Sequence, residues 1–183
     1  MSGWLATVLA AAVCVWCVVA RHWRRRRAEW SSRPQELAGA ELVYRETTFR
    51  SDAPFRLVAR VDRVYRQRDG TLVLVELKTR WHHRVQPSDI VQLSAQKMAL
   101  AASTGLPVAP YGYVFTQRPT GRAELRHHRV ALWSTAELEA LAARRRAVLQ
   151  EQVWARGAES ARTCEGCSFR SGCSQGQHGR GQV

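Results

Sequence analysis

The stretch RVDRVYRQRDGTLVLVELKTR, residues 60–80, decides how we expect this chain to fold. Two runs rich in valine and leucine, residues 55–67 and 71–79, lie on either side of Arg68, Asp69 and Gly70. A three-residue connection that ends in glycine is common in β-hairpins. The stretch therefore predicts two antiparallel strands joined by a tight turn.

The second strand of this hairpin carries two charges on a face that should be apolar. Side chains at positions i and i+2 lie on the same face of a strand, so Glu76 and Lys78 share the face of Leu74. If the turn is centred on Asp69, Asp62 lies opposite Glu76. Opposed carboxylates repel each other, because their Cβ atoms are only about 4.5–5.5 Å apart. The pair therefore requires a compensating cation.

A divalent metal ion is the cation that best suits this pair. Mg²⁺ binds a few carboxylate oxygens and keeps several waters, and it can activate water for attack on a phosphate. Lys78 is placed to orient that water or to stabilise negative charge on the phosphate. This arrangement predicts hydrolysis of a phosphodiester bond. A shift of one residue in the strand register would separate the two carboxylates. In that second interpretation, Asp62 and Glu76 form salt bridges on an exposed face of the sheet, with Arg60, Arg63 or Lys78 as partners.

The sequence RVD followed by VELKTR resembles the PD-(D/E)XK nuclease superfamily. In this resemblance Asp62 matches the metal-binding aspartate, and residues 76–78 match the (D/E)XK element. Among the branches of the superfamily, the chain is most similar to the RecB-like nucleases, including the CRISPR-associated exonucleases. The resemblance implies a restriction-endonuclease-like α/β fold, with a mixed β-sheet flanked by helices. It also implies DNA as substrate and Mg²⁺ or Mn²⁺ as cofactor.

The helix expected at residues 88–103, with Ser88 as N-cap, carries a second motif. RecB-like nucleases have a QxxxY motif after the ELK strand, and Gln92 matches its glutamine, so the resemblance implies a supporting role for Gln92 in catalysis. Gln96 stands where the family has tyrosine. The family also has a helix before the hairpin that offers a Glu or His to the metal, and both Glu41 and Glu46 fit that description. We expect this helix to begin at Pro34.

Three cysteines near the C-terminus form a third motif. Cys164, Cys167 and Cys173 have the spacing C-x2-C-x5-C, with which RecB-like nucleases bind an iron–sulfur cluster. Residues 18–163 contain no cysteine that could supply a fourth thiolate. His178 could complete a Cys₃His set, which suits structural Zn²⁺. The sequence therefore leaves a [4Fe–4S] cluster and Zn²⁺ as alternatives.

The N-terminus predicts a single membrane anchor. Residues 3–20 are free of charge and are long enough to span a bilayer. Five arginines follow within residues 21–27, and basic flanks remain on the cytoplasmic side. We therefore expect an anchor at residues 1–23, a basic linker at 24–34, a cytoplasmic nuclease-like domain at 35–155 and a metal-binding tail at 156–183.

The remaining pattern completes an α/β domain with a basic surface. Residues 111–117 and 123–132 predict two further strands, and residues 134–154 predict a helix with a Ser134–Glu137 capping box. The net charge is +13, and the chain keeps +8 without the five N-terminal arginines. Such a surplus suits a polyanion such as nucleic acid.

The sequence therefore predicts a membrane-anchored, metal-dependent DNA nuclease. The main alternative is a nuclease-like protein that binds nucleic acid at the membrane without cleaving it. This alternative is based on Gln96, which replaces the tyrosine of the family motif. A membrane-bound redox or zinc protein, with the cysteines as its main site, is a third. Two histidine pairs, residues 82–83 and 127–128, are candidates for phosphate contact or surface positions.

Overall fold

The structure is a computed structural model that describes residues 16, 33–119, 125–158, 161–165 and 167–173. The chain divides into two compact units, Met1–Glu139 and Ala140–Val183. The first contains the sheet and the candidate site, and the second contains Cys164, Cys167 and Cys173.

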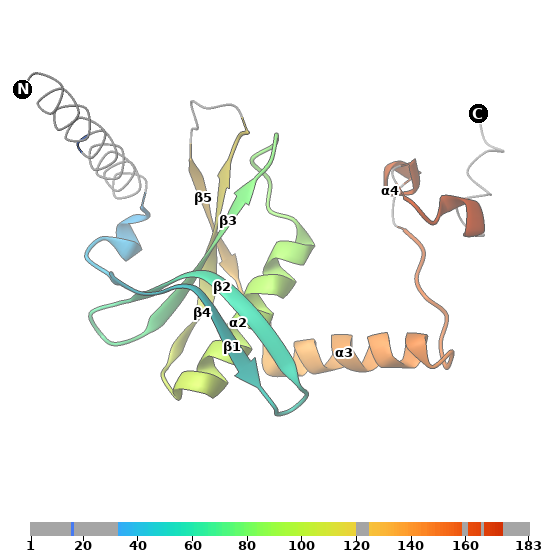
Figure 1. Ribbon diagram of the computed structural model, residues 1–183, viewed down its shortest axis with the longest axis horizontal. Coiled ribbons are helices and arrows are strands. Elements are labelled where there is room, and N and C mark those ends of the chain that lie inside the picture. The colour runs from blue at the N-terminus through green and yellow to red at the C-terminus, as the bar shows by residue number, and fades with distance from the viewer. Residues whose placement is uncertain (1–15, 17–32, 120–124, 159–160, 166, 174–183) are drawn as a thin grey trace, which may run out of the picture. The chain divides into compact units, whose positions relative to one another are not determined.

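The first unit is built on a five-stranded mixed sheet with the order β1-β2-β3-β4-β5 (Figure 1). All neighbouring strands are antiparallel except β3 and β4, which are parallel and are connected through helix α2 (Pro87–Thr104). A parallel pair needs a long crossover, and α2 provides it. The strands are β1 (Glu41–Ser51), β2 (Leu57–Arg66), β3 (Leu72–Thr79), β4 (Val108–Gln117) and β5 (Arg126–Ala131).

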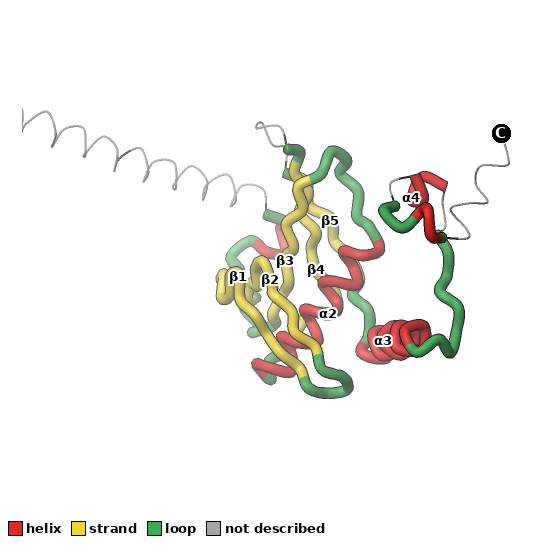
Figure 2. Tube along the Cα trace, turned by 45° about the vertical axis from the view of Figure 1, so that its right-hand side comes forward, coloured by secondary structure: helices red, strands yellow, loops and turns green. Residues whose placement is uncertain are grey.

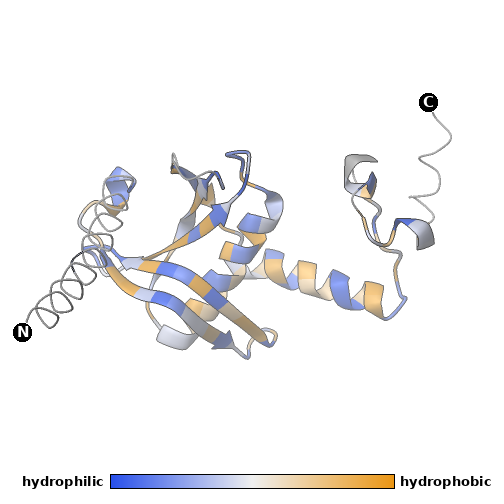
Figure 3. Ribbon diagram, turned by 45° about the horizontal axis from the view of Figure 1, so that its top comes forward, coloured by the Kyte–Doolittle hydropathy of each residue, from blue (hydrophilic) through white to orange (hydrophobic). Residues whose placement is uncertain are grey.

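Helix α2 covers one face of the sheet and packs on strands β1 to β4 (Figure 2). Because side chains alternate along a strand, neighbouring residues enter different clusters. Leu74 and Val114 pack with Leu93 and Leu100 on the α2 side, whereas Val75 and Phe115 pack on the opposite side. Hydrophobic and hydrophilic positions are interspersed along the strands of the sheet (Figure 3). The opposite cluster also contains Leu37, Tyr65, Val73 and Tyr113. This two-sided burial fixes the faces of β3 and β4.

The predicted hairpin is confirmed, with ends that differ by one or two residues. Strands β2 and β3 pair from Arg66 with Leu72 to Arg63 with Val75, which is the register of a turn centred on Asp69. Gly70 has φ 85°, a conformation that glycine adopts without a Cβ penalty.

The helix expected from Pro34 is wrong. Only the short 3₁₀ helix η1 (Gln35–Leu37) forms there, and β1 follows. Residues 41–51 are rich in Thr, Val, Tyr and Phe, which favour a pleated surface, and they pair with β2 over nearly their whole length. Pairing with an adjacent strand therefore outweighs a weak helical signal. Glu41 and Glu46 consequently lie on a strand.

The predicted helix at residues 88–103 is confirmed, but its start is not. Gln86 is the N-cap instead of Ser88, and Pro87 occupies the first turn, where its missing N–H costs nothing. The backbone N–H of Gln86 donates to Oδ2 of Asp89 at 2.8 Å. Gly105 ends the helix with φ 66°, as the sequence predicts.

The last predicted helix forms as α3 (Thr135–Leu149), five residues shorter at its C-terminal end than expected. The Ser134–Glu137 capping box is confirmed: Glu137 N–H donates to Ser134 Oγ at 3.3 Å, and Ser134 N–H donates to Glu137 Oε2 at 2.7 Å. In the second unit, α4 (Ala161–Glu165) and the 3₁₀ helix η2 (Arg170–Gly172) carry or border the cysteines.

The predicted membrane anchor lies, apart from Trp16, outside the described residues. Within the described part of the chain, no helix has both the length and the apolar character needed to cross a bilayer.

Candidate active site

Two carboxylates occupy opposite positions just beyond the paired part of strands β2 and β3. The last paired residues are Arg63 and Val75, and the next positions in the same register are Asp62 and Glu76. Asp62 is half-buried, and its Oδ2 accepts a hydrogen bond from the backbone N–H of Leu77 at 2.8 Å. Glu76 is only 3% exposed. The register therefore places both carboxylates at the same end of the hairpin.

Glu76 is the centre of a closed polar triangle with Lys78 and Gln92. Lys78 Nζ lies 2.8 Å from Glu76 Oε1 and donates to Gln92 Oε1 at 2.7 Å. Gln92 Nε2 donates to Glu76 Oε1 at 2.7 Å. Each member therefore fixes the other two. A buried carboxylate needs such partners, because removing its charge from water is costly.

Gln96 holds the second oxygen of Glu76. Its Nε2 donates to Glu76 Oε2 and to the backbone carbonyl of Arg60, both at 2.9 Å. Gln96 is 2% exposed, and its Oε1 has no hydrogen-bond partner among the described residues. The two acceptors fix the orientation of the amide, because the opposite orientation would place an oxygen against two oxygens. Sequence reasoning treated Gln96 as a departure from a motif, and its i, i+4 spacing from Gln92 was the signal that it shares the site.

The donor set of this site fits a hard divalent cation. Asp62 and Glu76 supply carboxylate oxygens, and Mg²⁺ is usually held by one or two carboxylates together with waters and substrate phosphates. Asp62 Oδ1 has no hydrogen-bond partner among the described residues, so it keeps its full capacity as a ligand. No group of three or more His, Cys, Asp or Glu able to hold a metal occurs in the described ranges. A two-carboxylate site is therefore the one that the geometry offers.

Comparison with known families agrees with this geometry. The model of the PD-(D/E)XK nuclease superfamily matches residues 3–174, nearly the whole chain. This chain belongs to the PD-(D/E)XK nuclease superfamily. Membership indicates a metal-dependent nuclease and accounts for the restriction-endonuclease-like arrangement of the mixed sheet.

Two other comparisons add little to this superfamily assignment. No curated protein sequence matches the chain. Among solved structures, "Crystal structure of SSO0001" aligns with a TM-score of 0.47 and 13% identity, over 92% of this chain and 73% of that one. A similarity of this degree carries no conclusion about substrate.

The exposed-face interpretation of the charges is wrong for this superfamily member. Lys78 does pair with Glu76, but Glu76 is buried under α2. Arg60 pairs with Glu46 instead, at 2.8 Å, and both of those side chains are more than half exposed. Glu46 has φ 49° and lies in the strand β1. In the β1–β2 register Glu46 falls opposite Asp62, but its carboxylate pairs with Arg60, and it forms no group of three potential metal ligands with the other described residues.

The loop after the PD-(D/E)XK strand is tied to the start of α2. Arg80 donates to both carboxylate oxygens of Asp89, at 2.9 and 3.0 Å, and to the carbonyl of Arg84 at 2.9 Å. Burial by itself would raise the pKa of Asp89, but the hydrogen bonds from Arg80 and Gln86 and the Arg80 charge outweigh burial. The pKa of Asp89 is therefore lowered, and its carboxylate stays charged.

One histidine of each predicted pair meets at Thr116 of this nuclease domain. Thr116 Oγ1 lies 2.9 Å from His83 Nδ1 and 3.1 Å from His128 Nε2. Thr116 is buried and is the register partner of Lys78 on β4. Burial lowers the pKa of His128, with further contributions from the charges of His83, His127 and Arg126. The other two histidines do not join: His82 is exposed, and the His127 ring lies against Tyr113 and Phe115 on the opposite face.

The cysteines are not assembled into a ligand set in the described residues. Cys164, Cys167 and Cys173 are free, with Cys167 exposed and the other two half-buried. The Cys167 N–H donates to the Cys164 carbonyl at 3.3 Å, which makes a turn between the two. His178 lies outside the described residues. The iron–sulfur and zinc alternatives therefore stay predictions.

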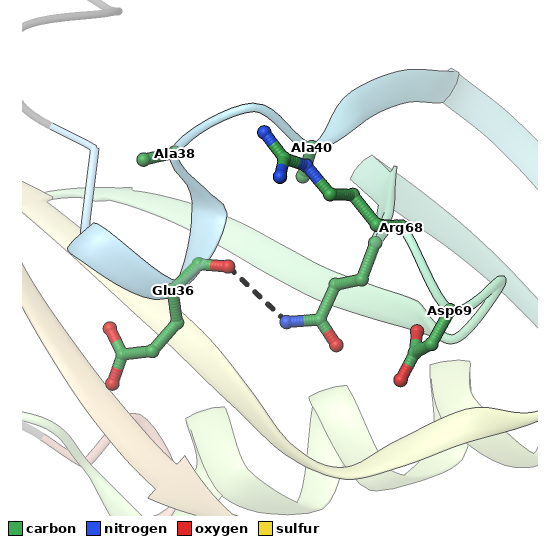
Figure 4. Close-up of a pocket in the computed structure, with 6 residues that line it drawn as sticks. Glu36, Ala38, Ala40, Arg68 and Asp69 are labelled. Carbon is green, nitrogen blue, oxygen red and sulfur yellow. Dashed lines mark hydrogen bonds between the residues drawn. The ribbon is translucent and has the colours of Figure 1, made fainter.

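A separate hollow of about 460 Å³ lies at the turn end of the β2–β3 hairpin (Figure 4). Gln67 crosses it and donates from Nε2 to the carbonyl of Glu36 at 3.2 Å. Ala38, Ala40, Arg68 and Asp69 complete the lining. None of the predicted nuclease residues lines this hollow.

Proposed function

We propose that this protein is a DNA nuclease that uses Mg²⁺ or Mn²⁺ to hydrolyse phosphodiester bonds. The observation that carries the proposal is the buried carboxylate of Glu76, which Lys78, Gln92 and Gln96 hold beside Asp62. Burial and three donors fix this carboxylate before any substrate binds. Preorganised charge of this kind stabilises a transition state without a reorganisation cost.

Asp62 and Glu76 would hold the metal ion. A bound Mg²⁺ or Mn²⁺ supplies charge neutralisation at the scissile phosphate and acidifies a bound water. An ammonium group has three N–H donors, and Lys78 gives one to Glu76 and one to Gln92. The third donor can bind a phosphate oxygen or the attacking water, so Lys78 contacts the reacting atoms. Gln92 positions Lys78 and Glu76 relative to each other.

The surroundings of this site support nucleic acid as the substrate and a place at the membrane. The net charge of +8 outside the N-terminal arginines attracts a polyanion. The uncharged residues 3–20 and the arginines after them support an anchored protein with its nuclease domain on the cytoplasmic side. The position of Gln92 and the spacing of the three cysteines support the RecB-like branch, with a [4Fe–4S] cluster or Zn²⁺ in the tail.

The contact between Gln96 and Glu76 favours cleavage over binding alone. A protein that had lost catalysis would have no need to hold a buried carboxylate through two glutamine amides. The glutamine at position 96, where the family has tyrosine, is the basis for the alternative of an inactive protein. In the structure this glutamine donates a hydrogen bond to the carboxylate of Glu76.

The experiment compares Lys78→Ala with Lys97→Ala in the full chain. Both variants remove one lysine, and Lys97 donates to the Trp133 carbonyl and lies near the Glu137 charge, outside the site. With Mg²⁺ and labelled DNA, Lys78→Ala should lower cleavage by about 100-fold or more, while Lys97→Ala keeps it. Asp62→Asn should lose Mg²⁺ binding in calorimetry. Normal cleavage by Lys78→Ala would contradict the proposed mechanism.

A further inference from the structure

The loop between β3 and α2 presents an exposed tryptophan close to the proposed catalytic lysine. Trp81 is 63% exposed. Its ring makes no contact with another ring or with a cation among the described residues. Among the described residues of the sheet-containing unit after residue 32, it is the only aromatic side chain that is mostly exposed. Among the described residues, none covers this large apolar surface, and it is open to a ligand.

The chain on both sides of Trp81 is fixed. The Arg80 side chain binds Asp89, which is 2% exposed, and the Arg80 N–H donates to the Gln117 carbonyl at 2.9 Å. Two residues after Trp81, His83 is held by the buried Thr116. The loop therefore loses little conformational entropy when a ligand binds to Trp81, and a preorganised contact binds more tightly.

Trp81 lies within reach of the same nucleic-acid strand as Lys78. The two residues are three positions apart, so their Cα atoms can be at most about 11 Å from each other. A DNA strand rises about 3.4 Å per nucleotide, so this distance corresponds to about three nucleotides. A base within about three nucleotides of the scissile phosphate can therefore meet the Trp81 ring.

The charge around Trp81 has the sign that a nucleic-acid strand requires. Residues 78–84 read KTRWHHR, with three permanent cations, two histidines and no acidic residue. Lys78 and Arg80 also pair with the carboxylates of Glu76 and Asp89. Arg84 is exposed beside the tryptophan. A basic segment with an aromatic platform is how proteins bind single-stranded nucleic acid, because every base has a π-face and the backbone is anionic.

We propose that Trp81 stacks on an unpaired base within about three nucleotides of the scissile phosphate, and that the substrate is DNA with a single-stranded region. This inference rests on the proposed nuclease function and names its substrate class. The face of a base inside a duplex is covered by its neighbours in the stack, so only an unpaired or terminal base can occupy the ring. Trp81 is a binding residue in this proposal, and Lys78 remains the group at the reacting phosphate.

The test measures binding of the full chain in detergent, without Mg²⁺ so that DNA is not cleaved. The probes are a labelled 12-nucleotide single strand and a relaxed, covalently closed circular duplex that contains the same sequence and has no terminal base. Trp81→Ala should weaken single-strand binding about tenfold or more, and Trp81→Phe should retain most of it, because stacking on an aromatic ring contributes about 1–3 kcal/mol per base. Trp154→Ala is the matched control, since Trp154 is 94% exposed and lies in the second unit. Duplex affinity should change less than about twofold if the contact requires an unpaired base.

The salt dependence of binding separates stacking from charge. Trp81→Ala should leave the slope of log affinity against log salt unchanged, whereas Arg84→Ala should reduce its magnitude by about one if Arg84 contacts a phosphate. Equal loss of single-strand and duplex binding in Trp81→Ala would overturn the proposal. In vesicles of brominated phosphatidylcholine, a part of the tryptophan quenching that is lost in Trp81→Phe but kept in Trp154→Phe would place Trp81 in the bilayer and would also overturn the proposal.

The outcomes also distinguish this inference from the proposed function. A protein that cleaves DNA through Lys78, but whose Trp81→Ala variant binds single strands normally, refutes stacking and keeps the nuclease. A protein that cleaves no DNA, but whose Trp81→Ala variant loses single-strand binding, refutes the nuclease mechanism and keeps the binding site.

Discussion

The sequence predicts two metal sites, the carboxylate site on β2, β3 and α2 and the cysteine segment of the second unit. The two differ in how far the structure brings their side chains together. Around Glu76, four side chains from two elements, β3 and α2, are joined by contacts of 2.7–2.9 Å. The three cysteines make no metal-ligating group with the other described residues, and Cys167 is exposed.

The difference lies in what positions the ligands. The register of β2 and β3 positions Asp62 and Glu76, and the packing of α2 positions Gln96. The fold of the chain itself therefore forms the carboxylate site. The cysteines lie on a five-residue helix, a turn and a 3₁₀ turn, which cannot impose ligand geometry alone. In small sites of that kind, metal binding and local folding are usually one process. We therefore expect the first site to depend on polar contacts and the second to depend on its metal.

The largest effect should follow from Gln96→Ala, which tests whether polar contacts position the carboxylate. The variant leaves Glu76 Oε2 and the Arg60 carbonyl without their donor. We expect cleavage to fall about 100-fold, since a displacement of about 1 Å can cost that much. Mg²⁺ affinity in calorimetry should fall about 10- to 100-fold, as for other groups that orient metal ligands.

The matched control for Gln96→Ala is Gln150→Ala, an exposed glutamine at the end of α3. It should leave cleavage and Mg²⁺ affinity unchanged. If Gln96→Ala lowers only the melting temperature and keeps the metal affinity of the folded protein, Gln96 is a core residue and not a positioning residue.

An intermediate effect is expected from Asp89→Asn, which tests the rigidity of the loop that carries Trp81. The change leaves the Arg80 guanidinium, 19% exposed, without its anion. We expect the free energy of unfolding at pH 7 to fall by about 2–4 kcal/mol, because removal of one partner of a buried ion pair is costly. Urea denaturation measures this loss. Asp69→Asn is the control, since Asp69 is exposed and only accepts from the Thr71 N–H.

The same variant has a pH signature with a definite sign. The pKa of Asp89 is lowered in the folded protein, so the unfolded chain takes up the proton first as pH falls. The stability that Asp89 contributes is therefore fully present above its unfolded pKa, about 3.9, and disappears as pH falls through the folded value. The free energy of unfolding of Asp89→Asn should therefore decrease less than that of the unmodified protein as pH falls through this range. An identical acid dependence in both proteins would show that the ion pair does not contribute.

The smallest effect on cleavage should come from the cysteines, provided that the two sites are independent. Replacement of Cys164, Cys167 and Cys173 by Ser should remove bound iron or zinc, measured by absorbance and elemental analysis after anaerobic purification. Cleavage by the folded protein should change less than about threefold, because the Glu76 contacts do not involve this segment. Cys14→Ser with Cys17→Ser is the control and should keep the metal. A loss of cleavage that follows the loss of metal would mean that the cysteine segment also organises the active site.

Much of the site could be predicted from the sequence, because its information is local. The turn at Asp69 and Gly70 determines the register, and the register alone predicts that Asp62 faces Glu76. The helix that carries Gln92 and Gln96 could be located from its apolar spacing and from Gly105 at its end. The role of Gln96 could not, because it depends on how closely α2 packs against β2 and β3.

The errors also have physical causes. Residues 41–51 become a strand because β2 offers them a pairing partner that the local sequence does not reveal. Ser88 is not the N-cap because Pro87 favours the first helical turn and Asp89 can reach back to the Gln86 N–H. In both cases a longer-range or reciprocal contact decided between two locally acceptable structures.

The sequence by itself determined the β2–β3 hairpin, the superfamily motif and the four residues Asp62, Glu76, Lys78 and Gln92. Local turn chemistry and side-chain alternation are sufficient for these, since both act over a few residues. Only the tertiary structure decided that Gln96 binds Glu76, that His83 and His128 meet at Thr116, and that Trp81 is left exposed by a fixed loop. Each of these depends on contacts between elements that are far apart in the chain.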